Sequence, residues 1–442
     1  METGKRRRAV AYKPVAALEV RIWGRRIGAL ALDPASNFYA FSYEPRFIAE
    51  AVELSPLQMR VRDAGPFIFP NLPQETFYRL PALLADVLPD RFGNALIDAW
   101  MAQNGVDAKQ VTPLDRLAYM STRGMGALTF APARGPARVK SFAVEMASLV
   151  EAARKSVQGE LYNDNIAEAA LKQIIQLGTS AGGARAKAVV AWNPVTQEIR
   201  AGQFDIDPGY QAWLLKFDGI RTEFKDLGPT ETYGRIEYAY HLMATEAGIA
   251  MSECQLLHEN GRAHFMTRRF DRDEGNQRHH MQTLCAMAHL DYNQVSTHSY
   301  DQLFATIERL ELGRPALQEA LRRMVFNVRA ANHDDHTKNF SFMLRQGSRH
   351  WELAPAYDIT YAYEPGNKWI ERHLMSVNGK FERIEVDDIR AVADRYGLLG
   401  AVKETLEKVD AAVARWPEFA AAAGISKDQA ERVAKGIAAV RI

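Results

Sequence analysis

The sequence predicts an α+β protein, because strand-like and helix-like spacings of apolar residues follow one another along the chain. Residues 18–30 alternate apolar and polar side chains on both sides of a glycine, which is typical of a half-buried β-hairpin, and a third strand is expected at 38–43. Residues 91–103 carry apolar side chains at helical spacing instead. Helical spacing dominates from about residue 298 onward, so the carboxy-terminal part is expected to be helical.

The composition is that of a folded globular protein. The chain has 442 residues, of which 47% are hydrophobic and 25% charged, so two or three packed units are expected. Its 55 basic and 54 acidic residues leave a formal charge of +1, which provides no overall field to attract nucleic acid or a membrane. The two cysteines, Cys254 and Cys285, lack C-x-x-C spacing, so neither a disulfide framework nor a zinc cluster is indicated. We expect a cytoplasmic protein without a membrane span.

Three units are expected along the chain. A short segment rich in proline and glycine, 131–136, is the best candidate for a linker between the first two. The units are a β-rich amino-terminal unit with helices (1–135), a mixed lobe (136–297) and a helical lobe (298–442).

The mixed lobe is expected to contain both kinds of element. Its expected elements are a helix at about 143–177, a Gly-rich turn at 178–183, strands at 188–192, 213–217 and 263–270, and a helix at 231–247. The helical lobe is expected to carry helices at 317–329 and 386–396, with a loop-strand-loop insert between 331 and 362. The insert holds most of the candidate catalytic and metal-binding residues.

The insert contains the spacing of a kinase catalytic loop. Asp334 precedes Asn339 by five positions, as in the motif in which the aspartate is the base and the asparagine a metal ligand. A strand at 340–344 follows, and a second acid, Asp358, is expected at another strand end, where the carboxylate and the amide oxygen suit Mg²⁺. The spacing alone also fits a polar turn between two strands. Together with Asp358 it indicates phosphoryl transfer.

Two further features fit a site for nucleotide phosphates. Lys216 lies inside an apolar strand, and kinases pair such a lysine with a helix glutamate, for which Glu237 is the natural candidate. Taken separately, a surface glutamate and a lysine that extends to solvent remain an alternative. The Gly-rich run 178–187 lets backbone N–H groups approach phosphate, with Arg185 or Lys187 adding charge, although a flexible connection is an equal alternative.

At these positions the sequence resembles the HipA family, the toxin kinases of type II toxin–antitoxin operons. The resemblance implies a small β-rich amino-terminal subdomain joined to a protein-kinase-like core of two lobes, with an all-helical carboxy-terminal lobe. The segments that carry it are 88–93, 178–187, 215–216, 269–272, 334–339 and 357–359.

The resemblance also implies roles for individual residues. Asp334 would be the catalytic base, Asn339 and Asp358 would bind Mg²⁺, and Lys216 would contact the phosphates of ATP. The implied nucleotide-binding residues are Ser180, Ala181, Gly182, Gly183, Ala184, Arg185, Lys187, Lys216, Gln282, Thr283, Leu284, His336, Lys338 and Tyr357.

The last implications concern regulation and partners. Ser180 matches the serine that HipA proteins autophosphorylate, and a phosphate there would repel ATP, although Thr179 beside it is an alternative acceptor. The implied partners are a protein substrate, in known cases an aminoacyl-tRNA synthetase, a HipB-like helix-turn-helix antitoxin, and operator DNA mainly through that antitoxin. Two alternatives stay open: a small-molecule kinase, and a catalytically silent nucleotide-binding partner of a DNA-binding antitoxin.

Overall fold

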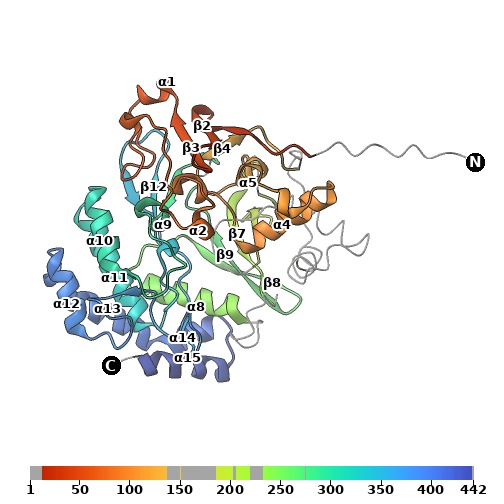
Figure 1. The fold of residues 1–442 in the computed structure, drawn as a ribbon. Coiled ribbons are helices and arrows are strands. Elements are labelled where there is room, and N and C mark those ends of the chain that lie inside the picture. The colour runs from red at the N-terminus through yellow and green to blue at the C-terminus, as the bar shows by residue number, and fades with distance from the viewer. Residues whose placement is uncertain are drawn as a thin grey trace, which may run out of the picture.

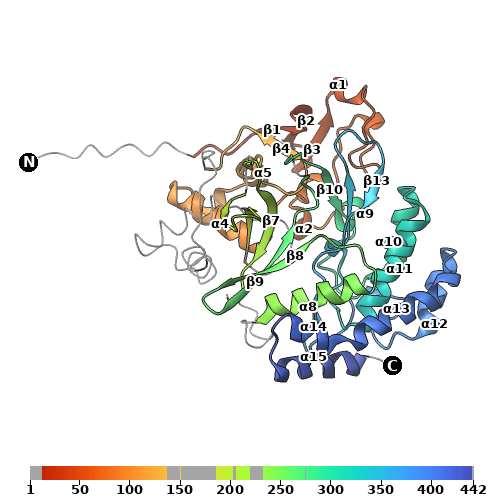
Figure 2. The same ribbon diagram turned by 180° about the vertical axis from the view of Figure 1, so that it is seen from behind.

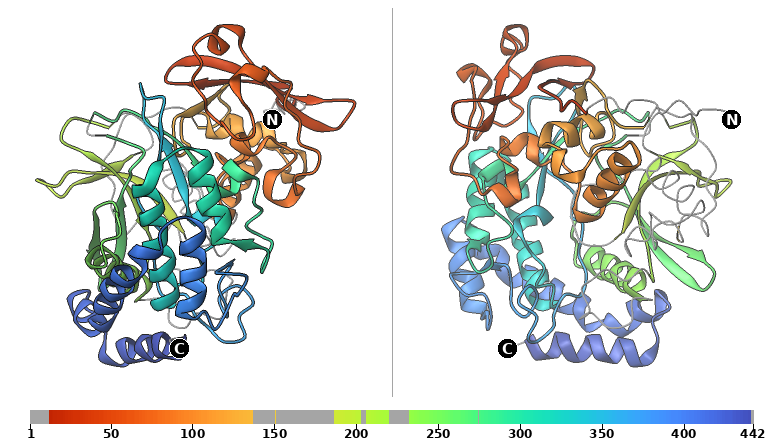
Figure 3. Two further views of the ribbon diagram at one scale, coloured as in Figure 1. Left: turned by 90° about the vertical axis from the view of Figure 1, so that its left-hand side faces the viewer. Right: turned by 45° about the vertical axis from the view of Figure 1, so that its right-hand side comes forward.

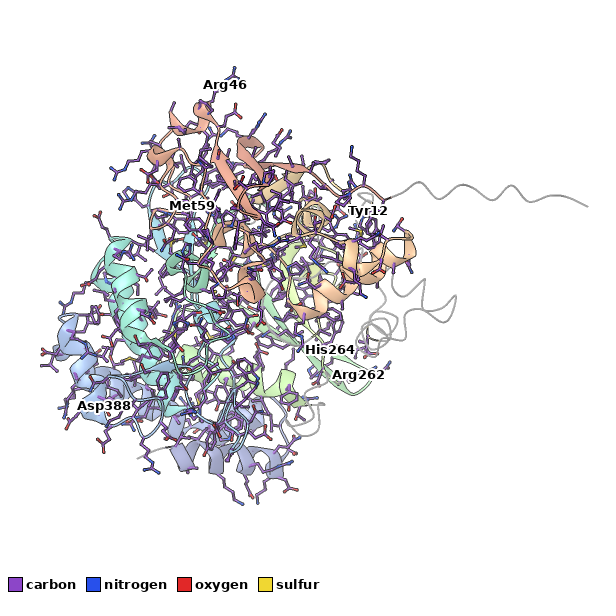
Figure 4. All side chains as sticks on the ribbon, viewed as in Figure 1. Tyr12, Arg46, Met59, Arg262, His264 and Asp388 are labelled. Atoms are coloured by element: carbon purple, nitrogen blue, oxygen red, sulfur yellow. The ribbon has the colours of Figure 1, made fainter. Side chains whose placement is uncertain are left out.

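The computed structural model describes residues 12–136, 150, 186–202, 206–219, 232–273 and 275–440 (Figure 1). The amino-terminal strands lie at one end of the molecule and the carboxy-terminal helices at the other. The strands of the mixed lobe, such as β7 (Gln211–Lys216) and β9 (Arg262–Arg268), lie between these two ends (Figures 1 and 2). In Figure 4, Arg46 lies at the outer edge of the amino-terminal part and Asp388 on the opposite side, in the helical lobe. The helix expected at 143–177 and the Gly-rich turn fall outside the described residues.

The amino-terminal part is built on an antiparallel sheet with strand order β3-β2-β1-β4. The predicted hairpin is confirmed, and its two-residue turn uses Trp23 and Gly24 at φ 50° and 77°, the positive angles that such tight turns require. The strands are β1 (Ala17–Ile22), β2 (Arg25–Asp33), β3 (Phe38–Tyr43) and β4 (Leu128–Ala131).

Short helices connect β3 to β4. The predicted helix at 91–103 is confirmed as α4, and it begins where the Asp90 side chain accepts a hydrogen bond from the Gly93 N–H at 2.8 Å. The helices are α1 (Pro45–Ile48), α2 (Gln74–Phe77), α3 (Ala82–Ala85), α4 (Arg91–Gln103) and α5 (Pro113–Met120), with 3₁₀ turns at η1 (Val61–Asp63) and η2 (Ala108–Gln110).

The mixed lobe contains a five-stranded antiparallel sheet with strand order β6-β5-β7-β9-β8. Helix α8 packs against β9 and carries Glu237. The expected strands at 188–192, 213–217 and 263–270 and the expected helix at 231–247 are confirmed. Their bounds and those of their neighbours are β5 (Lys187–Trp192), β6 (Ile199–Ala201), β7 (Gln211–Lys216), α8 (Tyr233–Glu246), β8 (Cys254–Glu259) and β9 (Arg262–Arg268).

The carboxy-terminal lobe is helical but also contains two small sheets, β10-β12-β13 and the parallel pair β11-β14. Figure 3 shows the last helices of this lobe, in dark blue, on the side of the molecule opposite the amino-terminal strands. The helices are α9 (Leu284–Ala288), α10 (Tyr300–Arg309), α11 (Gly313–Arg329), α12 (Val386–Arg395), α13 (Val402–Ala414), α14 (Trp416–Ala422) and α15 (Lys427–Val440), with 3₁₀ turns at η4 (Thr337–Asn339) and η5 (Leu399–Ala401). The strands are β10 (His280–Thr283), β11 (His298–Ser299), β12 (Ser341–Leu344), β13 (Trp351–Leu353) and β14 (Met375–Ser376).

Two hydrophobic cores organise the described residues. The larger contains apolar residues of the amino-terminal sheet and of α3 together with those of the helical lobe, such as Leu84 and Met287. The smaller joins α4 to the five-stranded sheet, through residues such as Ile97 and Trp213. The amino-terminal part is therefore packed against both lobes. Within the described residues, no helix has the length and apolarity needed to cross a bilayer.

Candidate active site

A cavity lies where the five-stranded sheet, the helical lobe and the amino-terminal part meet. It encloses about 1090 Å³ of empty space, open solvent at its mouth included. Its charged and polar lining residues are Asp86, Lys187, Lys216, Glu237, Ser252, Thr267, Arg268, Arg269, Thr283, Lys338, Asn339, Tyr357 and Asp358. Apolar side chains such as Met125, Phe270 and Met281 line the remainder.

Lys216 is the centre of a buried ion cluster in this cavity. Its Nζ lies 2.5 Å from Glu237 Oε1 and also contacts Asp358 Oδ1. The Lys216 and Glu237 side chains are only 8% and 2% exposed, so their charges are largely removed from water. Burying an ammonium group is costly unless anions receive it, and here two carboxylates do so. The structure thus brings β7, α8 and the Asp358 segment together at one point.

Asp358 lies in an irregular segment after β13, so its expected place at a strand end is wrong. Its backbone has φ 53°, in the left-handed region that residues other than glycine seldom adopt. Burial alone would raise the pKa of the Asp358 carboxyl, but Lys216 and then Lys187 hold it well below its usual value. The carboxylate is therefore ionised at neutral pH and faces the cavity.

The loop 333–339 places its acid and its amide side by side. Asn339 Nδ2 donates to the backbone oxygen of Asp334 at 2.7 Å, which fixes the amide plane beside that residue. The Asp334 side chain is 44% exposed, and its Oδ1 lies 3.7 Å from His336 Nε2. His336 Nδ1 accepts from the Lys338 N–H at 3.2 Å, so in the neutral imidazole the proton sits on Nε2, facing Asp334. Asn339 lines the cavity, whereas Asp334 and His336 are not among the lining residues described.

Asp335, which the sequence did not single out, anchors this loop. Its buried carboxylate accepts from the Tyr300 hydroxyl at 2.7 Å, from the Leu374 N–H at 2.8 Å and lies 2.8 Å from His373 Nδ1. These bonds connect the loop to α10 and to the segment that precedes β14. The neighbouring acids Asp334 and Asp335 are indistinguishable in sequence by residue type, yet one faces solvent and the other is enclosed.

Tyr357 and Lys338 link the loop to the Asp358 segment. The Tyr357 hydroxyl donates to the Lys338 backbone oxygen at 2.6 Å and also contacts Ser341 Oγ. The Phe270 ring stacks on Tyr357 with 5.8 Å between centroids and 28° between planes, which gives the cavity an aromatic wall. The Lys338 ammonium lies 4.5 Å from the centroid of the Tyr292 ring.

The three residues 282–284 differ in placement. Thr283 lines the described part of the cavity, whereas the Gln282 and Leu284 side chains are fully buried elsewhere. Gln282 Nε2 approaches Ser55 Oγ at 3.4 Å, and Leu284 joins the larger core. A side-chain contact to a nucleotide in this cavity is therefore expected from Thr283 but not from the other two.

The amino-terminal part supplies two acids that the sequence did not predict as site residues. Asp86 lines the cavity and accepts two hydrogen bonds from Thr283. Asp90 Oδ2 lies 3.7 Å from Lys187 Nζ, and both side chains are 4% exposed. Burial raises the pKa of Asp90 to about 6, with Lys187 acting in the opposite direction. The only sequence signal was that Asp90 lies within the segment 88–93 that carries the resemblance.

The predicted Gly-rich loop cannot be compared with this geometry. Thr179, Ser180, Ala181, Gly182, Gly183, Ala184 and Arg185 lie outside the described residues. Lys187 is described, and it lies directly opposite Lys216 in the antiparallel pair of β5 and β7. Two lysines at one end of a sheet, facing an ionised carboxylate, suit a ligand that carries both phosphate and a metal cation.

A lysine–glutamate pair between sheet and helix, facing an Asp-x₄-Asn loop across a cleft, is the arrangement of protein-kinase-like folds. The chain belongs to the HipA family: the HipA N-terminal domain matches residues 18–131 and the HipA-like C-terminal domain matches residues 179–439. No curated protein sequence matches it.

Solved structures with a similar fold include a HipA toxin. HipA of Shewanella oneidensis MR-1, in a complex with HipB and its operator DNA, has a TM-score of 0.67 and 18% identity, over 95% of each chain. The Helicobacter pylori proinflammatory kinase CtkA has a TM-score of 0.27 and 13% identity, over 46% of this chain and 90% of that one. The Shewanella protein shows that the HipA fold extends over nearly the whole chain.

Proposed function

We propose that this chain is a HipA-type toxin kinase, which transfers the γ-phosphoryl group of ATP to a serine or threonine hydroxyl of a protein. The observation that carries the proposal is the ion cluster of Lys216, Glu237 and Asp358, which faces Asn339 across one cavity. Lys187 and Lys338 line the same cavity, so three ammonium groups are available to phosphate oxygens.

The donor set fits Mg²⁺. Among the described residues, no cluster of three or more His, Cys, Asp or Glu side chains is arranged to hold a metal. The protein would supply two ligands, the Asp358 carboxylate and the Asn339 amide oxygen. Phosphate oxygens and waters would supply the other ligands of an octahedral Mg²⁺ site. The lowered pKa of Asp358 supports this role, because a metal-binding carboxylate must be ionised. Bound Mg²⁺ would neutralise the charge that develops on the phosphates.

The other residues of the site would bind the phosphates and accept the proton of the acceptor hydroxyl. Glu237 holds Lys216 where it can bind the phosphates, and Asp334 accepts the proton of the attacking hydroxyl. The acceptor oxygen then bonds to the γ-phosphorus as the bond to the bridging oxygen breaks, leaving ADP.

The exposure of Asp334 favours a protein acceptor over a small molecule. Its side chain is 44% exposed, rather than enclosed in a deep acidic pocket, and Asn339 holds its backbone oxygen. A hydroxyl presented on a protein segment can reach it there. An aminoacyl-tRNA synthetase remains the substrate that the family suggests.

Regulation and partners extend the proposal. We propose Ser180, with Thr179 as the alternative, as the site at which autophosphorylation inactivates the kinase, because a phosphate there would repel ATP. The Shewanella HipA is in a complex with HipB and operator DNA. We infer a HipB-like antitoxin as the partner of this chain, with operator DNA reached mainly through it.

The test is phosphoryl transfer from labelled ATP with Mg²⁺ to a lysate or to the chain itself. Asp334→Ala should lower the rate by roughly 10²–10⁴-fold, the scale of a general base. Asp387→Ala is the matched control, because it removes a carboxylate that is 87% exposed on α12. An Asp334→Ala rate equal to wild type would remove Asp334 from the mechanism. Tight ATP binding without any turnover by wild type would favour the silent regulatory partner instead.

A further inference from the structure

One segment of the amino-terminal part crosses from the core of the helical lobe to the core of the mixed lobe. Residues 82–88 contribute Leu83 and Leu84 to the larger core, where α3 packs against α9, the helix that carries Met287. A few residues later α4 enters the smaller core with the five-stranded sheet, and Figure 1 shows α4 beside β7. The segment between the two cores, which contains Asp86, forms part of the cavity wall.

Polar contacts hold this segment against residues 269–283, which lead from β9 to α9 and form the connection between the two lobes. Asp86 Oδ2 accepts from the Thr283 N–H and Asp86 Oδ1 from the Thr283 hydroxyl, both at 2.8 Å. Thr283 ends β10 and caps α9, so it belongs to the chain that leads from the sheet into the helical lobe. Both carboxylate oxygens of Asp86 therefore accept hydrogen bonds from Thr283.

A second part of the amino-terminal region holds the same connection further upstream. The Gly126 N–H donates to Asp271 Oδ2 at 2.6 Å. The Arg278 guanidinium donates to the backbone oxygens of Thr122 at 3.0 Å and of Gly124 at 3.1 Å. The connection is therefore held at both ends by residues of the first 136.

Each lobe is also held directly. On the mixed lobe, Asp90 lies 3.7 Å from Lys187. On the helical lobe, the Thr76 hydroxyl bonds to Asp291, and Asn293 Nδ2 donates to Thr76 Oγ1 at 2.8 Å. Thr76, Asp86 and Asp90 thus attach one short stretch of chain to one lobe, to the connection and to the other lobe.

We propose that the stretch 76–90 is a splint across the interlobe connection, and that Asp86 is a positioning residue that fixes the shape of the nucleotide cavity. Two-lobed proteins open and close by changes at a few residues of such connections. When the connection is already held in place, no free energy of ligand binding is used to order the connection, so the ligand binds more tightly. The inference rests on the proposed function only in taking ATP as the ligand.

Electrostatics and positioning predict opposite effects at Asp86. A carboxylate in the wall of a cavity for an anionic nucleotide repels it, so removal of the charge alone should tighten ATP binding. Removal of the bonds to Thr283 should weaken it. Asp86→Asn removes the charge and keeps an acceptor for the Thr283 N–H, whereas Asp86→Ala removes both.

The experiment measures the dissociation constant of a fluorescent ATP analogue with Mg²⁺, for the full chain and its variants. Asp86→Ala should bind at least about tenfold more weakly than wild type, because both bonds that hold Thr283 are lost. Asp86→Asn should bind within about threefold of wild type, or more tightly, because it keeps an acceptor for the Thr283 N–H and loses the charge that repels the nucleotide. Glu75→Ala removes an exposed acid directly before the stretch, and this control should not change binding.

Thr76→Val tests the splint away from the cavity and keeps the side-chain shape. It should also weaken binding, although Thr76 is not among the cavity-lining residues described. Hydrogen–deuterium exchange of 277–283 without nucleotide should be faster in Asp86→Ala and Thr76→Val than in wild type. Wild-type affinity in both variants would overturn the splint. Wild type that binds no analogue would instead overturn the proposed function, and the exchange rates would still report on the splint.

Discussion

Replacement of Lys216 by methionine tests the ion cluster through stability alone. Lys216→Met keeps the length of the side chain but leaves Glu237, which is 2% exposed, and Asp358 without the ammonium between them. Loss of one partner of a buried ion pair costs about 3–5 kcal/mol, because the remaining charge stays buried. We therefore expect the free energy of unfolding at pH 7 to fall by about that amount.

The pH dependence of the free energy of unfolding tests the same assignment independently. The pKa of Asp358 is lower in the folded protein than in the unfolded chain, so its contribution to stability is present above about pH 5 and is lost as the pH falls below about 4. Without Lys216 that pKa rises and the contribution disappears at every pH. The difference in stability between wild type and Lys216→Met should therefore be largest near pH 7 and should shrink in acid.

Urea unfolding at pH 7 and at about pH 3 measures both effects, because the Asp358 contribution is lost only below the unfolded pKa of about 4. Lys403→Met is the control, because this lysine is 87% exposed on α13 and its replacement should change stability by no more than about 0.5 kcal/mol. If Lys216→Met is as stable as wild type at pH 7, or if the difference grows in acid, the assignment of Lys216 as the charge that holds Asp358 is wrong.

Two further variants test how the site is positioned. Asp335→Asn weakens the bonds to Tyr300 and His373, so phosphoryl transfer should fall by about 10- to 100-fold, mainly in kcat, because the Asp334 loop is displaced while the cavity is retained; a change in KM alone would contradict this. Gly234→Ala places a Cβ 2.2 Å from the Ala263 backbone oxygen, which must move α8 away from β9 and Glu237 away from Lys216; transfer should fall at least about tenfold, and an unchanged rate would show that the pair tolerates the shift.

The sequence predicted the elements whose apolar spacing is long and regular. The hairpin β1–β2, the helix α4 and the strands β5 and β7 have five or more residues in a consistent pattern, and each was found. Short elements such as α2, α3 and β6 span only three or four residues, too few for a spacing to be recognised. Their existence depends on tertiary packing.

The site was predicted where residue type and spacing carry the chemistry. Lys216 and Glu237 were found as a pair because a charge inside an apolar strand requires a partner, and the structure brings them together. Asp86 was missed because its partner Thr283 lies 197 residues away and nothing local marks it. Gln282 and Leu284 were predicted together with Thr283, but alternate residues of β10 point to opposite faces, which separates Gln282 from Thr283, and Leu284 begins α9 in the larger core.

A crystal structure with a non-hydrolysable ATP analogue and Mg²⁺ tests the proposed chemistry at its centre. We predict one metal ion between Asp358 and the Asn339 amide oxygen, at about 2.0–2.1 Å from each, with the phosphates on Lys216. A nucleotide bound outside this cavity, or a metal that touches neither residue, would contradict the assignment of this site to phosphoryl transfer.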